Sequence, residues 1–284
     1  MVPEGATVLP NPNGTAPGLC LEHQDRQLFL LPGPPRELKP MVENHVLPRL
    51  PGRPALDYRV FKVAGLGESQ VEEKVAPVLA SLTGLELGYC ARMGEVEVRI
   101  ISDKPTNDEA ERRIRAELRE SIFGMGDDRL EDIVIKLLTA AGQTVATAES
   151  CTGGQIAHRL TNVSGSSAAF LGGWVTYSNQ AKQRDLGVPG DLLAEHGAVS
   201  EPVACAMAEG ARQRSGATFA LSATGIAGPT GGTPEKPVGL VYVALATPTR
   251  TVCLKQQWLL DRETFKFFVA QTALDLLRRE LIAK

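Results

Sequence analysis

The sequence has few of the features that mark secreted, membrane-spanning or metal-dependent proteins. Its five cysteines include no C-x-x-C pair, which argues against a disulfide framework or a zinc site and for reduced thiols. The four histidines form no cluster with metal-ligand spacing. No apolar run is long enough to span a bilayer, and the N-terminus lacks the basic region and apolar core of a secretory signal. We therefore expect a cytoplasmic protein with no membrane association and no metal site.

An excess of charge of one sign is also absent. The chain has 284 residues and a net charge of −3, so the overall balance indicates no nucleic-acid partner. The hydrophobic fraction is 43% and the charged fraction 22%, which is typical of a globular chain with about two domains.

Proline and turn-forming residues are frequent in residues 1–54. Residues 10–18 have the composition of a loop, residues 27–31 (QLFLL) predict a short buried strand, and residues 36–50 predict a helix with Pro40 near its start. One or two strands and one helix cannot bury a core of their own. We therefore expect this segment to be the remnant of a larger α/β domain whose earlier part lies outside the chain.

Residues 55–125 predict a small α+β linker domain. The expected elements, in order, are a strand at 58–63, a helix at 68–82, a hairpin of 87–92 with 95–101, and a charged helix from about 106 to 123. An RNA-binding KH domain carries a basic G-x-x-G loop. The turn Gly65-Leu66-Gly67-Glu68 does not fit that pattern, so a structural linker is favoured over an RNA site.

Residues 126–284 alternate between strand and helix patterns. The expected helices are 130–141, 155–163, one beginning after Ser178, one beginning after Ser200, and 262–281. The expected strands are the segment entering residue 147, then 170–177, 219–223, 240–246 and 251–259. This order predicts the fold class α/β, as a three-layer α/β/α sandwich with a mixed sheet.

The turn at residues 147–154 carries the clearest chemical signal. An apolar strand leads into it, and a helix leaves it near Gln155. Ser150, Cys151 and Thr152 stand in a row there, followed by two glycines that allow a ligand to approach the backbone. We expect backbone N–H groups to point outward at the helix start, in a positive local field. We predict that Ser150 is a nucleophile.

Two further segments are expected beside this turn. Tyr177 ends a predicted strand, and Lys182 lies about one helical turn beyond it. The Gly-rich segment 224–232 follows a third strand. Since ligands of α/β sheets bind beyond the carboxyl ends of strands, the three loops are predicted to share one rim with Ser150.

No histidine is placed to activate Ser150. His158 lies two turns down its helix, and His196 is expected in a loop. A serine without histidine can use a lysine as base if burial keeps the amine neutral, and Lys182 is the candidate. Tyr177 would then relay a proton or orient the amine.

Each of these features also has a purely structural explanation. Ser150 fits a helix cap, residues 177–182 fit a solvated helix start, and segment 224–232 matches neither of the usual nucleotide-binding glycine patterns.

Several segments, taken together, resemble the CinA (competence/damage-inducible) family. They are residues 11–18, 31–41, 147–154, 175–182, 196–203, 225–229 and 235–239. The resemblance implies a molybdopterin-binding-like remnant at 1–54, a KH-like domain at 55–125 and the CinA C-terminal amidase domain at 126–284. The family's N-terminal domain is linked to a metal-dependent ADP-ribose pyrophosphatase. Because the Gly-rich nucleotide loop of that domain is missing here, we do not expect that activity.

The resemblance implies a nicotinamide mononucleotide (NMN) deamidase, a hydrolase of NAD metabolism that releases ammonia and nicotinate mononucleotide. By motif position, Ser150 is the nucleophile, and Lys182 and Tyr177 are its catalytic partners. The implied substrate-binding residues are Cys151, Thr152, Gly153, Gly154, Ser167, Thr224, Gly225 and Arg262, with Arg262 pairing with the phosphate. No cofactor is implied, so activity is expected to survive EDTA. A homodimer is expected, because the shortened first domain leaves apolar surface uncovered.

Two alternatives remain open from the sequence. Cys151 could be the nucleophile, because a thiol at a helix start has a lowered pKa. The chain could instead be a non-catalytic nucleotide-binding protein of competence or DNA-damage responses. The sequence also leaves open whether the N–H groups at 151–154, or Thr224, face the oxyanion or the phosphate.

Overall fold

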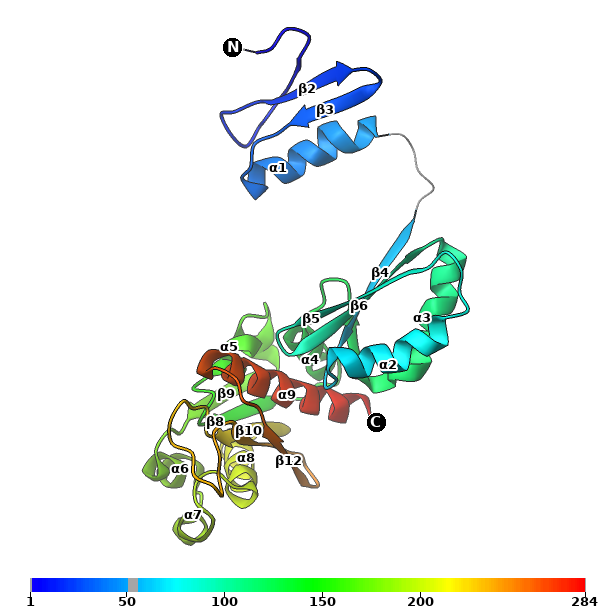
Figure 1. Ribbon diagram of the computed structural model, residues 1–284. Helices are drawn as coiled ribbons and strands as arrows, with labels where there is room; N and C mark the ends of the chain where they lie inside the picture. Colours follow the sequence, from blue (N-terminus) through cyan, green and yellow to red (C-terminus); the bar gives the residue numbers. More distant parts are fainter. Residues whose placement is uncertain (1, 51–55, 284) are drawn as a thin grey trace. The chain divides into compact units, whose positions relative to one another are not determined.

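The computed structural model describes residues 2–50 and 56–283 (Figure 1). The chain divides into two compact units, residues 1–55 and 56–284, which are described separately. The domain boundary predicted between residues 54 and 55 lies outside the described residues.

The first unit is a small antiparallel sheet with one helical segment. Its strands, in the order β1-β2-β3, are Thr7–Leu9, Gly18–His23 and Arg26–Leu30. Helix α1 (Pro35–Met41) runs on as a π-helical turn (Val42–Val46) and a 3-10 turn (Leu47–Arg49). The prediction of a buried strand at 27–31 is wrong for alternate residues, since Leu28 is 58% exposed and Leu30 49%. Successive strand residues point to opposite faces, and only the face carrying Phe29 is packed.

The second unit begins with an α+β module. Its antiparallel sheet has the order β5-β6-β4-β7. The elements in chain order are β4 (Asp57–Val63), α2 (Glu68–Leu79), β5 (Glu86–Arg92), β6 (Glu95–Ser102), α3 (Lys104–Leu118) and β7 (Ile122–Met125). Both helices cover one face of the sheet, where Val75 and Ile114 pack with Phe61 (Figure 1).

One predicted boundary in this module is wrong. The helix expected to reach residue 123 ends at Leu118, where Arg119 takes a positive φ of 45°. Residues 122–125 form β7 instead and pair with β4. The short segment had no alternation to mark it as a strand; the pairing with β4 determines it.

The rest of the second unit is an α/β/α sandwich around a five-stranded mixed sheet, as predicted. The strand order is β12-β11-β10-β8-β9, with β8 parallel to both neighbours and the β10-β11-β12 pairs antiparallel. The strands are β8 (Val145–Glu149), β9 (Phe170–Val175), β10 (Phe219–Gly225), β11 (Leu240–Ala246) and β12 (Thr251–Gln257).

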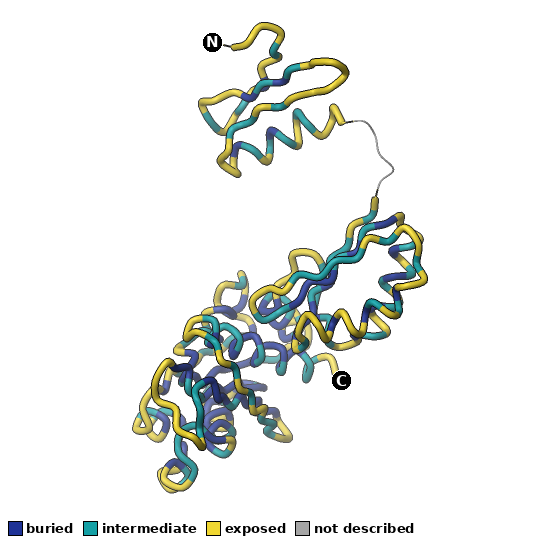
Figure 2. Tube along the Cα trace, in the orientation of Figure 1, coloured by how far each residue is buried: buried dark blue, intermediate teal, exposed yellow. Residues whose placement is uncertain are grey.

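Three helices pack on each face of this sheet. Helices α4 (Leu130–Ala140), α5 (Gln155–Thr161) and α9 (Arg262–Ile282) lie on one face. Helices α6 (Asn179–Leu186), α7 (Gly190–His196) and α8 (Glu201–Ser215) lie on the other. Buried residues gather in the inner strands and the facing sides of the helices (Figure 2). His196, expected in a loop, is the last residue of α7. Of the helices within residues 2–50 and 56–283, none is long and apolar enough to cross a membrane.

Three chain segments lie together at the carboxyl ends of the parallel strands. The turn after β8 and the residues after β9 lie side by side, since the N–H of Thr176 donates to the carbonyl of Glu149 at 2.8 Å. The end of β10 joins them through the N–H of Ser150, which donates to the carbonyl of Ala223 at 2.9 Å. The three loops predicted to share a rim therefore do so.

Candidate active site

Ser150 and Lys182 are in direct contact at this edge. The Nζ of Lys182 donates to the Oγ of Ser150 at 2.9 Å and to the carbonyl of Thr176 at 2.7 Å. Ser178 sets this geometry by capping α6, because its Oγ accepts the N–H of Ala181. Lys182 consequently lies in the first turn of α6 with its side chain directed back to the sheet edge.

Burial changes the acidity of this lysine. Lys182 is 1% exposed, and loss of hydrating water lowers the pKa of its ammonium from 10.5 to about 8. No carboxylate in the described part of the chain forms an ion pair with it. About one tenth of the amine is then neutral at pH 7, compared with less than about one thousandth for an ordinary lysine. The neutral amine can accept the proton of the Ser150 hydroxyl.

Glu149, just before the nucleophile candidate, is a residue that the sequence analysis missed. It is fully buried. Its carboxylate accepts the backbone N–H groups of Gly154 at 3.0 Å, Ile156 at 3.0 Å and Ala157 at 2.8 Å. The expectation of free N–H groups at this helix start is therefore wrong for these three groups, because the Glu149 carboxyl already occupies them.

The turn itself leaves backbone N–H donors close to Ser150. The N–H of Gly153 donates to the Ser150 carbonyl at 3.2 Å. Gly153 and Gly154 have φ values of 62° and 98°, which residues with side chains adopt at a cost. The N–H groups of Cys151 and Thr152 make no hydrogen bond to another residue that the structure describes. The residue after a nucleophilic serine is the usual donor to an oxyanion.

The thiol of Cys151 does not have the lowered pKa that the alternative assignment of the nucleophile requires. Cys151 is 5% exposed, and burial raises the pKa of its thiol to about 12. The positive field of the helix start is compensated by Glu149. The thiol is therefore uncharged at neutral pH, which argues against Cys151 as the nucleophile.

Tyr177 and Arg262 form a second pair at the rim. Nη2 of Arg262 donates to the Tyr177 hydroxyl at 2.6 Å, and Nη1 donates to the carbonyl of Gly228 at 2.9 Å. Asp261 places Arg262 by capping α9, as predicted, through the N–H groups of Glu263 and Thr264. Among the described residues, the Tyr177 hydroxyl has no hydrogen bond to Lys182 or Ser150. Arg262 therefore ties Tyr177 to the Gly-rich loop.

The remaining predicted residues have different surroundings. The Thr224 hydroxyl donates to the carbonyl of Ala198 at 2.8 Å, so its proton is not free for an oxyanion. A Cβ on Gly225 would lie 2.7 Å from the carbonyl oxygen of Leu240, so this glycine permits close strand packing. Thr152 is buried, and its hydroxyl has no partner within the described residues.

The structure does not bring Ser167 to this site. It lies before β9, next to the hydrogen bond from the N–H of Val145 to the carbonyl of Ala169, at the amino end of the parallel strands. Ser150 follows the carboxyl end of β8, five residues after Val145, or about 16 Å away. Within one chain, Ser167 therefore lies at the opposite end of the parallel strands from Ser150 and not in the pocket that the resemblance implies.

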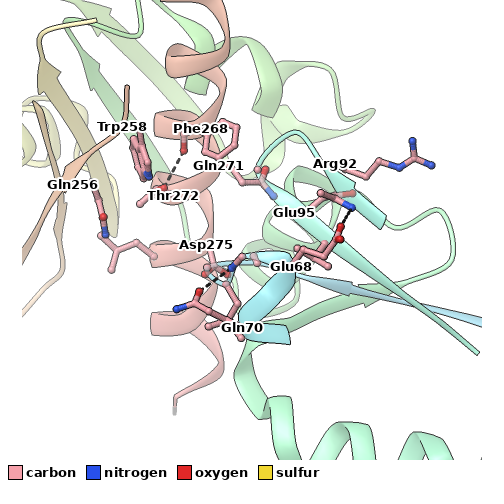
Figure 3. Close-up of a pocket in the computed structure, with 18 of the residues that line it drawn as sticks. Glu68, Gln70, Arg92, Glu95, Gln256, Trp258, Phe268, Gln271, Thr272 and Asp275 are labelled. Carbon is pink, nitrogen blue, oxygen red and sulfur yellow. Dashed lines mark hydrogen bonds between the residues drawn. The ribbon is translucent and has the colours of Figure 1, made fainter. Parts of the chain in front are cut away.

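A separate cavity of about 670 Å³ lies between the α+β module and the face formed by α9 and β12 (Figure 3). Trp258 and Phe268 form its aromatic wall, with ring centroids 5.9 Å apart. Gln271 also lines it and is buried, with both amide atoms unpartnered among the described residues. None of the candidate site residues lines this cavity.

Replacing Glu149 tests how the turn is stabilised. In Glu149→Gln, one oxygen remains as an acceptor and the new NH2 group faces backbone donors. We expect the variant to lose about 2–4 kcal/mol of stability. Both tryptophans, Trp174 and Trp258, lie in the sandwich, so their fluorescence reports its urea unfolding. The matched control is Glu209→Gln on the exposed side of α8, which is expected to change stability by less than about 0.5 kcal/mol. Equal midpoints for the two variants would contradict this account of the turn.

Comparisons with known proteins agree on one family. Residues 127–281 match the model of the CinA C-terminal domain, and residues 58–124 match that of the damage-inducible protein CinA KH domain. The CinA-like protein of Akkermansia muciniphila is 48% identical over 96% of this chain and 68% of its own length. A putative competence-damage inducible protein of Moorella thermoacetica is 46% identical over 100% of this chain and 71% of its own.

Solved structures point the same way. The competence/damage inducible protein CihA of Agrobacterium tumefaciens is 45% identical, with a TM-score of 0.51 over 52% of this chain and 91% of that one. A CinA superfamily protein of Escherichia coli is 34% identical, with a TM-score of 0.51 over 52% of this chain and 87% of that one. Family models match both the α+β module and the sandwich, and the chain is a member of the CinA family.

Proposed function

We propose that the chain is an NMN deamidase, which hydrolyses the carboxamide of NMN to nicotinate mononucleotide and ammonia. The observation that carries the proposal is the 2.9 Å contact between the Oγ of Ser150 and the Nζ of a buried lysine. A lowered lysine pKa and a hydroxyl within hydrogen-bond reach are the two requirements of a serine–lysine hydrolase. The substrate itself rests on the resemblance of the motifs to the family.

The first half of the reaction forms an acyl-enzyme. Neutral Lys182 takes the hydroxyl proton of Ser150 while Oγ bonds to the carboxamide carbon, and the carbonyl electron pair moves to oxygen. The N–H of Cys151 stabilises the oxyanion. The C–N bond then breaks, and the nitrogen takes the proton from Lys182 and leaves as ammonia.

The second half uses water as the nucleophile. Neutral Lys182 takes a proton from water while the water oxygen bonds to the acyl carbon. The bond to Oγ then breaks, and Ser150 recovers the proton from Lys182. The acid product leaves as nicotinate mononucleotide. Tyr177, tied to Arg262, is proposed to orient the substrate at the rim.

The test is an assay of the purified chain with NMN. We expect ammonia and nicotinate mononucleotide in equal amounts, at a rate unchanged by EDTA. Hydroxylamine should intercept the acyl-enzyme and yield a hydroxamate in place of the acid. Binding of NMN in calorimetry without ammonia release would contradict the proposal and favour a non-catalytic nucleotide-binding protein. The homodimer and the cytoplasmic location stay predictions.

A further inference from the structure

The position of the substrate phosphate follows from the charges around the Ser150 turn, and this inference rests on the proposed function. A phosphate commonly binds the free N–H groups of a helix start. Here Glu149 already occupies the N–H groups of Gly154, Ile156 and Ala157. A dianionic phosphate at the same place would face a buried carboxylate. The phosphate therefore needs a cation elsewhere at the rim.

Lys266 supplies a cation next to the turn. Its Nζ lies 3.6 Å, and its Cε 3.8 Å, from the point where a Cβ on Gly153 would stand. Gly153 is exposed and comes three residues after Ser150. Lys266 also lies four residues after Arg262 on α9, so the two side chains project from the same face of that helix. The ammonium thus lies at the open rim, close to the nucleophile.

The other cations of α9 are already engaged. Arg262 binds Tyr177 and a carbonyl, while Arg278 and Arg279 pair with Asp275. Lys266, in contrast, is half-buried and has neither an ion pair nor a hydrogen bond to any other residue that the structure describes. A partly desolvated ammonium without a counter-ion is unfavourable, and a bound anion relieves that cost.

We propose that Lys266 binds the 5′-phosphate of the substrate and makes the enzyme selective for the nucleotide over the nucleoside. Arg262 already uses two of its five N–H donors on the Tyr177 hydroxyl and the carbonyl of Gly228, whereas none of the three donors of Lys266 is used among the described residues, so we assign the phosphate contact to Lys266. The turn at 150–153 then lies between the two ends of the ligand. Ser150 faces the carboxamide, and Gly153 lies beside the phosphate.

The experiment compares NMN with nicotinamide riboside, which lacks the phosphate, in wild type and in Lys266→Gln. We expect Lys266→Gln to lower kcat/KM for NMN by about 10- to 100-fold, mainly through KM, and to leave the riboside unchanged within about twofold. Lys266→Arg should restore most of the selectivity. Lys136→Gln, an exposed lysine on α4, is the charge-matched control and should act as wild type on both substrates. Inorganic phosphate should compete with NMN in wild type and lose this effect in Lys266→Gln.

Equal losses on NMN and the riboside, or no loss on either, would overturn the phosphate contact while leaving the deamidase in place. If wild type releases no ammonia, the proposed deamidase function is refuted. The phosphate contact of Lys266 is then tested by measuring ligand binding in calorimetry. Weaker binding of NMN to Lys266→Gln, with unchanged riboside binding, supports the contact. Equal NMN affinities of wild type and variant, or no NMN binding at all, refute it.

Discussion

Ser150→Ala is expected to lower ammonia release from NMN by about 10⁴-fold or more, because removal of the nucleophile leaves only binding and oxyanion stabilisation. Only Oγ is lost. The N–H of Ser150 still donates to the carbonyl of Ala223, so the path of the turn should not change. The variant should therefore bind NMN with an affinity close to that of wild type. Ammonia release and calorimetry, measured on the same preparations, check both halves of the prediction.

Cys151→Ala is the matched control for this prediction. Cys151 is the next residue after Ser150, and its Sγ is also a potential nucleophile. The pKa of its thiol is raised to about 12, so no thiolate is available at neutral pH. We expect it to retain activity within about tenfold of wild type, the loss coming from the small cavity left in the core. Activity that survives Ser150→Ala and disappears in Cys151→Ala would reverse the assignment of the nucleophile.

Local sequence chemistry was sufficient for much of the framework of this site. Ser178 and Asp261 cap their helices as their residue types predict, and these caps fix the first turns that carry Lys182 and Arg262. The alternation of strands and helices predicted the sandwich. Parallel strands then bring Ser150 and Lys182 together although 32 residues separate them. These predictions rest on helix-capping residue types, on the alternation of strands and helices, and on the rule that the carboxyl ends of parallel strands lie together.

The residues that sequence reasoning missed depend on the path of the turn or on tertiary packing. The N–H groups that bind Glu149 lie five to eight residues later in the chain, beyond the spacing of an ordinary cap. Lys266 reaches Gly153 from a helix more than 100 residues away. Ser167, in contrast, was expected at the site and lies elsewhere, because a motif match does not tell which end of a strand its residue will occupy.

Glu149 and Lys182 lie close together at this site but have different hydrogen-bond partners. The carboxyl group of Glu149, beside the nucleophile, accepts three backbone N–H groups. Lys182 has no carboxylate partner among the described residues, and burial lowers the pKa of its ammonium. Since the carboxylate is directed into α5, it does not form an ion pair that would hold the lysine protonated. The turn therefore holds a buried carboxyl group close to the amine base without an ion pair between the two.

The pH dependence of kcat/KM should follow Lys182. The folded pKa of this lysine is about 8, and the base is its neutral form. Lowering the pH below 8 should therefore reduce kcat/KM by about tenfold per pH unit, and above 8 the rate should level off. The profile is measured with NMN between pH 6 and 9.5, where the phosphate is mostly dianionic at and above neutral pH. A flat profile over this range would remove Lys182 from the role of base.

Lys182→Met gives the second readout of the same group. We expect it to reduce kcat by about 10³- to 10⁴-fold, because no other base contacts Ser150 among the described residues. The variant should also change how stability depends on pH. In wild type the folded pKa lies below that of the unfolded chain, so between pH 8 and 10.5 the unfolded state binds more protons and stability rises with pH. This rise should be smaller in Lys182→Met and unchanged in Lys136→Met, the exposed control on α4. An inactive variant that keeps the full rise would mean that Lys182 acts in catalysis without the lowered pKa, and the amine would then serve as a charged donor to the oxyanion.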